Sequence, residues 1–124
     1  MLTFQGVRDV DRLLVTADIY REEAEVYALQ GQADNNQSAA RRSLRLFLEA
    51  VLTGEANLNP EVIQKIETLR LKLDAPALPV ETRLALLDYL DRLLALGDDF
   101  LATARLTRPD LQAAKSALDR PDIH

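Results

Sequence analysis

Apolar side chains recur along the first part of the chain at alternating steps of three and four residues, which places them on one face of an α-helix. Six residues follow this pattern: Val10, Leu13, Ala17, Tyr20, Ala24 and Tyr27. The next step falls on Gly31, and glycine adopts the left-handed conformation that closes a helix without steric cost. The pattern therefore predicts a helix from about Val7 to Gln30.

A second apolar stripe lies on the opposite side of this predicted helix. It consists of Val15, Ile19 and Val26. Two interpretations are open: the helix is covered on two sides inside the fold, or the stripe is an interface with another chain. Internal burial is favoured, because small helical domains often pack a helix on two faces. The three residues remain the candidate protein interface of the sequence.

The polar stretch QADNN separates this segment from a second apolar pattern. Asn35 or Asn36 is expected to cap the next helix, because asparagine side chains accept hydrogen bonds from free backbone amides. That helix is predicted over about Gln37 to Thr53, and Gly54 is expected to end it. Its inner arc contains six residues: Ala40, Ser43, Leu44, Phe47, Ala50 and Val51.

Four more helices are predicted in the second half. Asn59-Pro60-Glu61 combines a capping side chain, a proline at the first helical position and an acid, so a helix should run to about Leu73. Val80 to Leu96 is apolar almost all round and should form the most buried helix. Gly97 is expected to close it, and a short helix and a last one over about Pro109 to Leu118 follow.

Strand signals are nearly absent, so the chain is predicted to be all-α with five or six helices. At 124 residues it has the size of one domain. We therefore expect a single domain over residues 1–124, with an ordered core over about 7–118 and a frayed tail over 119–124.

Two segments share the order helix, glycine, short polar turn, helix: YREEAEVYALQG with the helix after it, and LLDYLDRLLALGDDFLATARL. Both resemble tetratricopeptide hairpins. The matching positions are Tyr20, Ala24, Tyr27, Gly31, Ser43, Phe47 and Ala50 in the first, and Leu90, Leu93, Gly97 and Ala102 in the second. The chain is also similar to a bacterial family of small tetratricopeptide-like proteins of unassigned function. The resemblance implies two antiparallel hairpins bridged by a third helix, in a right-handed superhelix or a compact bundle.

Composition narrows the classes of function. The sequence contains no cysteine, which excludes disulfides, thiolate catalysis and sulfur-ligated metals. No apolar run approaches about 18 residues, and the opening residues lack the pattern of a secretory signal, so we expect a cytoplasmic protein that does not span a membrane. The net charge of -5 makes nonspecific attraction to nucleic acid unfavourable and favours protein partners.

Candidate chemistry is sparse. The single histidine is His124, at the expected frayed end, so a histidine-based dyad or triad cannot be assembled within one chain. The carboxylates that could act as paired acids or metal ligands are Glu22, Glu23, Glu25, Asp88 and Asp91. Their spacing favours positions on solvated helix faces instead. Asp91 and Arg83 project among leucines, where a structural ion pair or a capping role with another element is favoured over a ligand contact. We assign no catalytic residue, cofactor or metal, and expect no enzyme.

The one concentrated basic patch consists of Arg41, Arg42 and Arg45. It suits phosphate or an acidic peptide, but no aromatic residue interleaves with it to stack on bases, so ordinary solvation is favoured. The sequence therefore predicts a noncatalytic protein-interaction or scaffold domain, with self-association through the stripe of Val15, Ile19 and Val26 as one candidate mode of binding. The alternative is a helical protein that binds phosphate or nucleic acid through the three arginines.

Overall fold

The computed structural model describes residues 2–53, 58–74 and 77–118, and the side chains from Val10 onward. Six helices make up this part of the chain, with no strand: α1 (Leu2–Leu29), α2 (Ala33–Thr53), α3 (Pro60–Lys72), α4 (Val80–Leu94), α5 (Asp98–Thr103) and α6 (Arg108–Leu118). The predicted all-α class and number of helices are confirmed. The predicted helix end at Gly54 and the tail over 119–124 lie outside the described residues.

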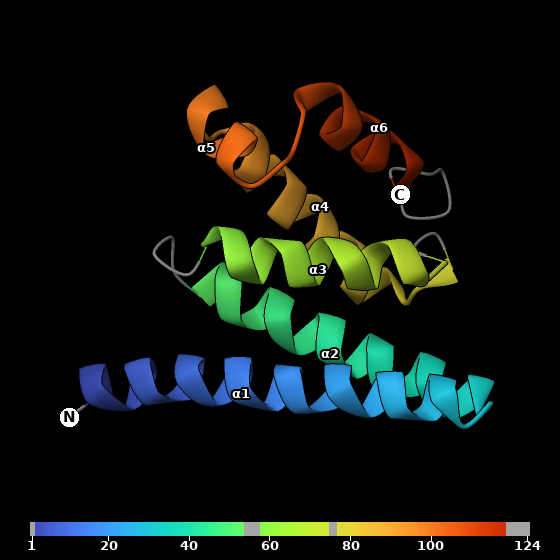
Figure 1. The fold of residues 1–124 in the computed structure, drawn as a ribbon. Coiled ribbons are helices and arrows are strands. Elements are labelled where there is room, and N and C mark those ends of the chain that lie inside the picture. The colour runs from blue at the N-terminus through green and yellow to red at the C-terminus, as the bar shows by residue number, and fades with distance from the viewer. Residues whose placement is uncertain (1, 54–57, 75–76, 119–124) are drawn as a thin grey trace.

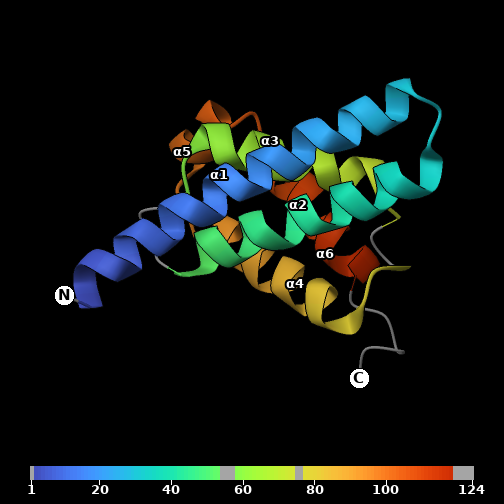
Figure 2. The same cartoon turned by 90° about the horizontal axis from the view of Figure 1, so that it is seen from below.

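Helix α2 is at the centre of the arrangement. It packs on α1 along most of its length and also contacts α3 and α4, and α6 packs in turn on α4. Both views show α1 and α2 side by side (Figure 1, Figure 2), with α3 to α6 on the far side of α2 from α1 in Figure 1. One face of α1 is therefore covered by α2, and the opposite face is left at the edge of the fold.

The turn between α1 and α2 is tighter than predicted. Gly31 has the expected positive φ of 73°, and the amide of Gln32 donates to the Tyr27 carbonyl over 2.9 Å, as in a Schellman closure. Helix α2 already begins at Ala33, so the prediction that Asn35 or Asn36 caps it is wrong. The amide side chain of Asn36 instead donates to the Ala24 carbonyl of α1 over 2.6 Å. The Asn36 side chain therefore bonds to the neighbouring helix and does not cap its own.

Small residues form the contact between α1 and α2. The Ser43 hydroxyl donates to the Ala17 carbonyl over 2.6 Å, and neither residue is exposed. The bond from Asn36 to Ala24 repeats this contact one heptad along the hairpin. Ala24 follows Ala17 by seven residues on α1, and Asn36 precedes Ser43 by seven on α2. Alanine and serine allow the two backbones to approach closely enough for these bonds. The hairpin is thus held by packing and by two side-chain bonds to main-chain oxygens.

The residues predicted to pack the two hairpins fall into three groups. Those that are buried are Ala24, Ser43, Phe47, Ala50, Leu90 and Leu93. Tyr20 and Tyr27 are only partly buried, and the Tyr27 hydroxyl donates to Glu23 over 3.0 Å. Gly31, Gly97 and Ala102 are exposed. For Ala102 the expectation of close packing is wrong, because α5 is six residues long and turns its other side to the core through Leu101.

Helices α3 and α4 begin at the predicted residues, but α4 is less buried than predicted. The Asn59 side chain caps α3 by accepting the Val62 amide over 2.9 Å. Helix α4 is not buried all round, since Val80 and Leu84 are 42% and 50% exposed. Its core side is formed by Leu86, Tyr89, Leu90 and Leu93. The prediction that α4 is the most buried helix is wrong, because leucine content alone does not show how many neighbours surround a helix.

A polar network lies in the core between α3 and α4. Glu67 is buried, and its carboxylate accepts from the Arg70 guanidinium over 2.6 Å and 3.1 Å. The Tyr89 hydroxyl donates to the same carboxylate over 3.1 Å. Burial raises the pKa of Tyr89 well above its ordinary value, and the negative charge of Glu67 raises it further. This network ties two helices together through one carboxylate.

An arginine closes the end of α4. The Arg108 guanidinium donates to the carbonyl oxygens of Leu94 over 2.7 Å and Leu96 over 2.8 Å, and pairs with Asp98 at 2.7 Å. Gly97 has an ordinary φ of -71° and lies beyond the C-cap residue Ala95, so the prediction that it closes α4 is wrong. The carbonyl groups left free at the helix end are satisfied by a side chain of α6 instead.

Candidate functional site

A groove of about 720 Å³ lies between α1, α2 and α3. Its apolar lining includes Ala24 and Ala28 of α1, Ala40 of α2 and Leu69 of α3, and Leu29 stands at its border. Alanine side chains are too small to fill the space between three helices, so the groove remains open. The sequence did not reveal this groove, because its lining comes from three separate segments that each contribute common helix-forming residues.

Ion pairs between α1 and α3 border the groove. Asp18 accepts from Lys65 over 2.9 Å and from Arg21 over 3.1 Å, and Arg21 also lies 3.5 Å from Glu25. Partial burial raises the pKa of Asp18, but the hydrogen bonds from Lys65 and Arg21 outweigh it, and the pKa falls below the ordinary 3.8. The stabilisation from Asp18 is therefore complete above that value and is lost as the pH falls through the lowered pKa.

The candidate acids do not converge on a shared site. Glu23 accepts from Tyr27, and Asp88 pairs with Arg92 at 3.4 Å within α4. Asp91 is exposed and not enclosed by leucines, and it pairs with Lys115 of α6 at 2.6 Å. The expected ion pair between Asp91 and another element is thus confirmed, although its burial was wrong. Over the described ranges, no three side chains of the metal-binding types are grouped to hold an ion.

The outer stripe, which we define as Val15, Ile19 and Val26, lies on the face of α1 turned away from α2. Its side chains are 60%, 55% and 49% exposed. The favoured interpretation of the sequence, burial inside the fold, is therefore wrong for this chain. Periodicity showed that the stripe exists, but only the position of α1 at the edge of the fold shows that no described element covers it.

The arginine patch of Arg41, Arg42 and Arg45 lies exposed on α2. No ion pair joins any of the three to a described residue. The Arg42 guanidinium lies 5.8 Å from the centre of the Tyr20 ring, within the range of a cation–π contact. The expectation that no aromatic residue accompanies the patch is corrected, because Tyr20 comes from α1 and is brought beside α2 by the hairpin.

Comparisons of the chain with protein-family models, with curated proteins and with solved structures found no match. Within the part of the chain that the structure describes, no helix combines the length and the apolarity that crossing a bilayer requires. The surfaces available for a functional argument are the groove, the outer stripe and the arginine patch.

Proposed function

We propose that this protein is a noncatalytic protein-interaction domain that binds its partner through the outer stripe of α1. The observation that supports this most directly is the exposure of three aliphatic side chains in one line, about half or more of each being open to solvent. Single exposed apolar residues are common, but an aligned set on one helix face is typical of an interaction surface. Helix α1 carries these side chains on the face opposite the one that packs on α2.

Replacing Ile19 with aspartate tests the outer stripe. Because Ile19 is 55% exposed, the change should cost less than about 0.5 kcal/mol in the free energy of unfolding. We expect the variant to lose the protein that the wild type captures from an extract of the cells that make it. Leu84→Asp is a matched control, since Leu84 is 50% exposed on α4 and is not part of the stripe.

Two results would contradict this proposal. One is a capture profile that is the same for the wild type and Ile19→Asp while both remain folded. The other is a loss of partner that occurs equally in Leu84→Asp, which would indicate a general effect of an added charge. A second copy of the chain is the other candidate occupant of the stripe, and sedimentation of the purified protein over a range of concentrations reports on it.

Anion binding by the arginine patch is a second candidate function. It is favoured by three exposed guanidinium groups that have no carboxylate partner among the described side chains, in a chain with a net charge of -5, and by the Tyr20 ring beside Arg42. A labelled single-stranded oligonucleotide should then bind at low salt and weaken as salt rises. Replacing all three arginines with alanine should abolish that binding. Absence of binding by the wild type at low salt would end this candidate.

A further inference from the structure

The outer stripe is part of a longer seam. Glu22 and Leu29 continue the spacing of Val15, Ile19 and Val26, so five residues follow one another at steps of four, three, four and three. This average of 3.5 residues is the spacing at which one helix receives the side chains of another. All five side chains are exposed, and Leu29 is 89% exposed. The seam spans about 21 Å along α1, enough for several turns of a partner helix.

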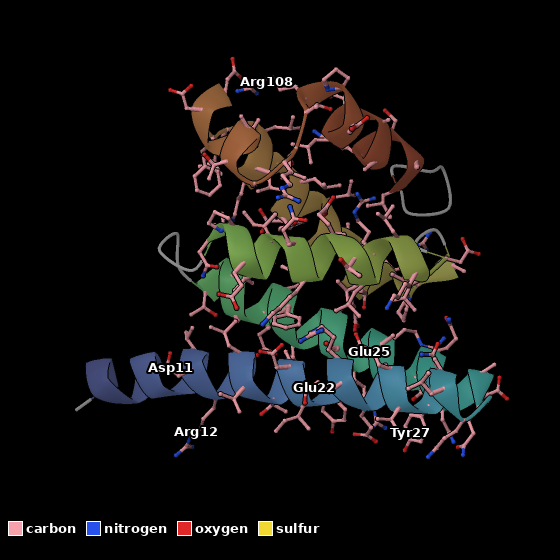
Figure 3. The ribbon with its side chains drawn as sticks, viewed as in Figure 1. Asp11, Arg12, Glu22, Glu25, Tyr27 and Arg108 are labelled. Carbon is pink, nitrogen blue, oxygen red and sulfur yellow. The ribbon has the colours of Figure 1, made fainter. Side chains whose placement is uncertain are left out.

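The charges beside the seam are mainly negative. Glu22 lies within it, and Asp11 and Glu25 are exposed along the same helix (Figure 3). Arg12 is the one exposed cation among the described side chains of α1, and it lies near the N-terminal end of the seam. Arg21 leaves Glu22 and Asp11 uncompensated, because its guanidinium pairs with Asp18 and Glu25. A partner helix therefore meets apolar side chains between carboxylates.

A second copy of the chain does not satisfy this pattern in either of two registers that align the seam residues. In a parallel pairing of two α1 helices, Glu22 would face the second copy's Glu22. In an antiparallel pairing that matches Val15 with the second copy's Val26, Glu22 would face the second copy's Ile19. Either arrangement buries a carboxylate without a cation, which is strongly unfavourable. The position of Glu22 thus acts against self-association through the seam at neutral pH.

We propose that the occupant of the seam is an amphipathic helix of another protein, with a lysine or arginine placed opposite Glu22 and further basic residues along its edges. This inference rests on the proposed function, because it names the partner of the same surface. The aliphatic side chains supply apolar burial, and the basic residues satisfy Glu22 and Asp11. Specificity then comes from charge, since an acidic helix with the same apolar residues would bring like charges together.

Two synthetic helical peptides of about 21 residues test the inference. Both peptides have an apolar seam of leucine and isoleucine. In the lysine peptide, the central seam residue and the positions that flank the seam are lysine. In the glutamate peptide, the same positions are glutamate. Fluorescence anisotropy should show the lysine peptide binding at least about tenfold more tightly to the wild type. Glu22→Lys should reverse this preference. Glu81→Lys is the matched control, because Glu81 is an exposed acid at the start of α4 and should leave the preference unchanged.

The same proteins examined by sedimentation complete the test. The wild type should remain monomeric, whereas Glu22→Leu, which makes the seam apolar throughout, should self-associate. Failure of the lysine peptide to bind, equal binding of both peptides, or dimers of the wild type that Ile19→Asp abolishes would each overturn the inference. Any of these three results leaves the proposed function supported if capture of a protein still depends on Ile19. If Ile19→Asp has no effect on capture or on peptide binding, the proposed function itself fails.

Discussion

Replacing Glu67 with alanine is expected to destabilise the fold by about 3 to 5 kcal/mol, the cost of removing one partner from a buried ion pair. The carboxylate accepts from Arg70 and from the Tyr89 hydroxyl, and it lies in the core between α3 and α4. Without it, the guanidinium and the phenol lose their hydrogen-bond partner away from bulk water. Urea denaturation at neutral pH, followed by circular dichroism, measures the difference in the free energy of unfolding.

Two further variants separate the charge of Glu67 from its hydrogen bonds. Glu67→Gln keeps an acceptor for the Tyr89 hydroxyl and removes the charge, so it should lie between the wild type and Glu67→Ala. Replacing Glu67, Arg70 and Tyr89 together with leucine, methionine and phenylalanine should recover most of the loss, because no polar group is then stranded. A loss below about 1 kcal/mol for Glu67→Ala would show that the network contributes little.

The raised pKa of Tyr89 gives the same network a dependence on alkaline pH. A phenol whose pKa is higher in the folded state contributes stability that is fully present below the unfolded value of about 10. That contribution is lost as the pH rises through the folded pKa. In the denaturation series, the wild type should therefore lose stability above about pH 10 more steeply than Tyr89→Phe, which has no proton to release at this position.

Ala17→Leu is expected to cost about 3 kcal/mol, the upper part of the range for overpacking a close contact. Ala17 has no exposed surface, and its carbonyl accepts the Ser43 hydroxyl over 2.6 Å. A leucine at this point separates α1 from α2, which lengthens that bond and reduces packing along the hairpin. The midpoint of urea denaturation should fall accordingly.

Ala102→Leu provides the matched control for this substitution. Ala102 corresponds to a hairpin-packing position in the sequence pattern, yet it is exposed on α5. The same added side chain should therefore change the free energy of unfolding by less than about 0.5 kcal/mol. Equal losses for Ala17→Leu and Ala102→Leu would contradict the described contact between α1 and α2.

Local signals in the sequence were sufficient for the helices and for some of their ends. The steps of three and four residues identified the helical segments, Gly31 identified the closure of α1, and Asn59 identified the start of α3. Each of these features depends on neighbours within a few residues. The same signals placed the start of α2 four residues late, since Asn36 bonds to another helix.

Features that need two distant segments were not predictable in this way. The exposure of Ile19 depends on which side of α1 receives α2, and the two faces of that helix have similar residue types. The contact of Tyr20 with Arg42 and the closure of α4 by Arg108 depend on how the helices cross. The seam could be found from the sequence as a pattern. Its availability to a partner could not.

The hairpin of α1 and α2 also bears on how the chain reaches its native state. Its partners are close in sequence, because Asn36 bonds to Ala24 across 12 positions and Ser43 to Ala17 across 26. Contacts of short sequence separation cost little loop-closure entropy and form early in folding. By contrast, Gln64 bonds to the Ala104 carbonyl across 40 positions. We therefore expect the hairpin to act as the nucleus on which the later helices dock, so that changes at Ser43 slow folding and changes at α6 mainly speed unfolding.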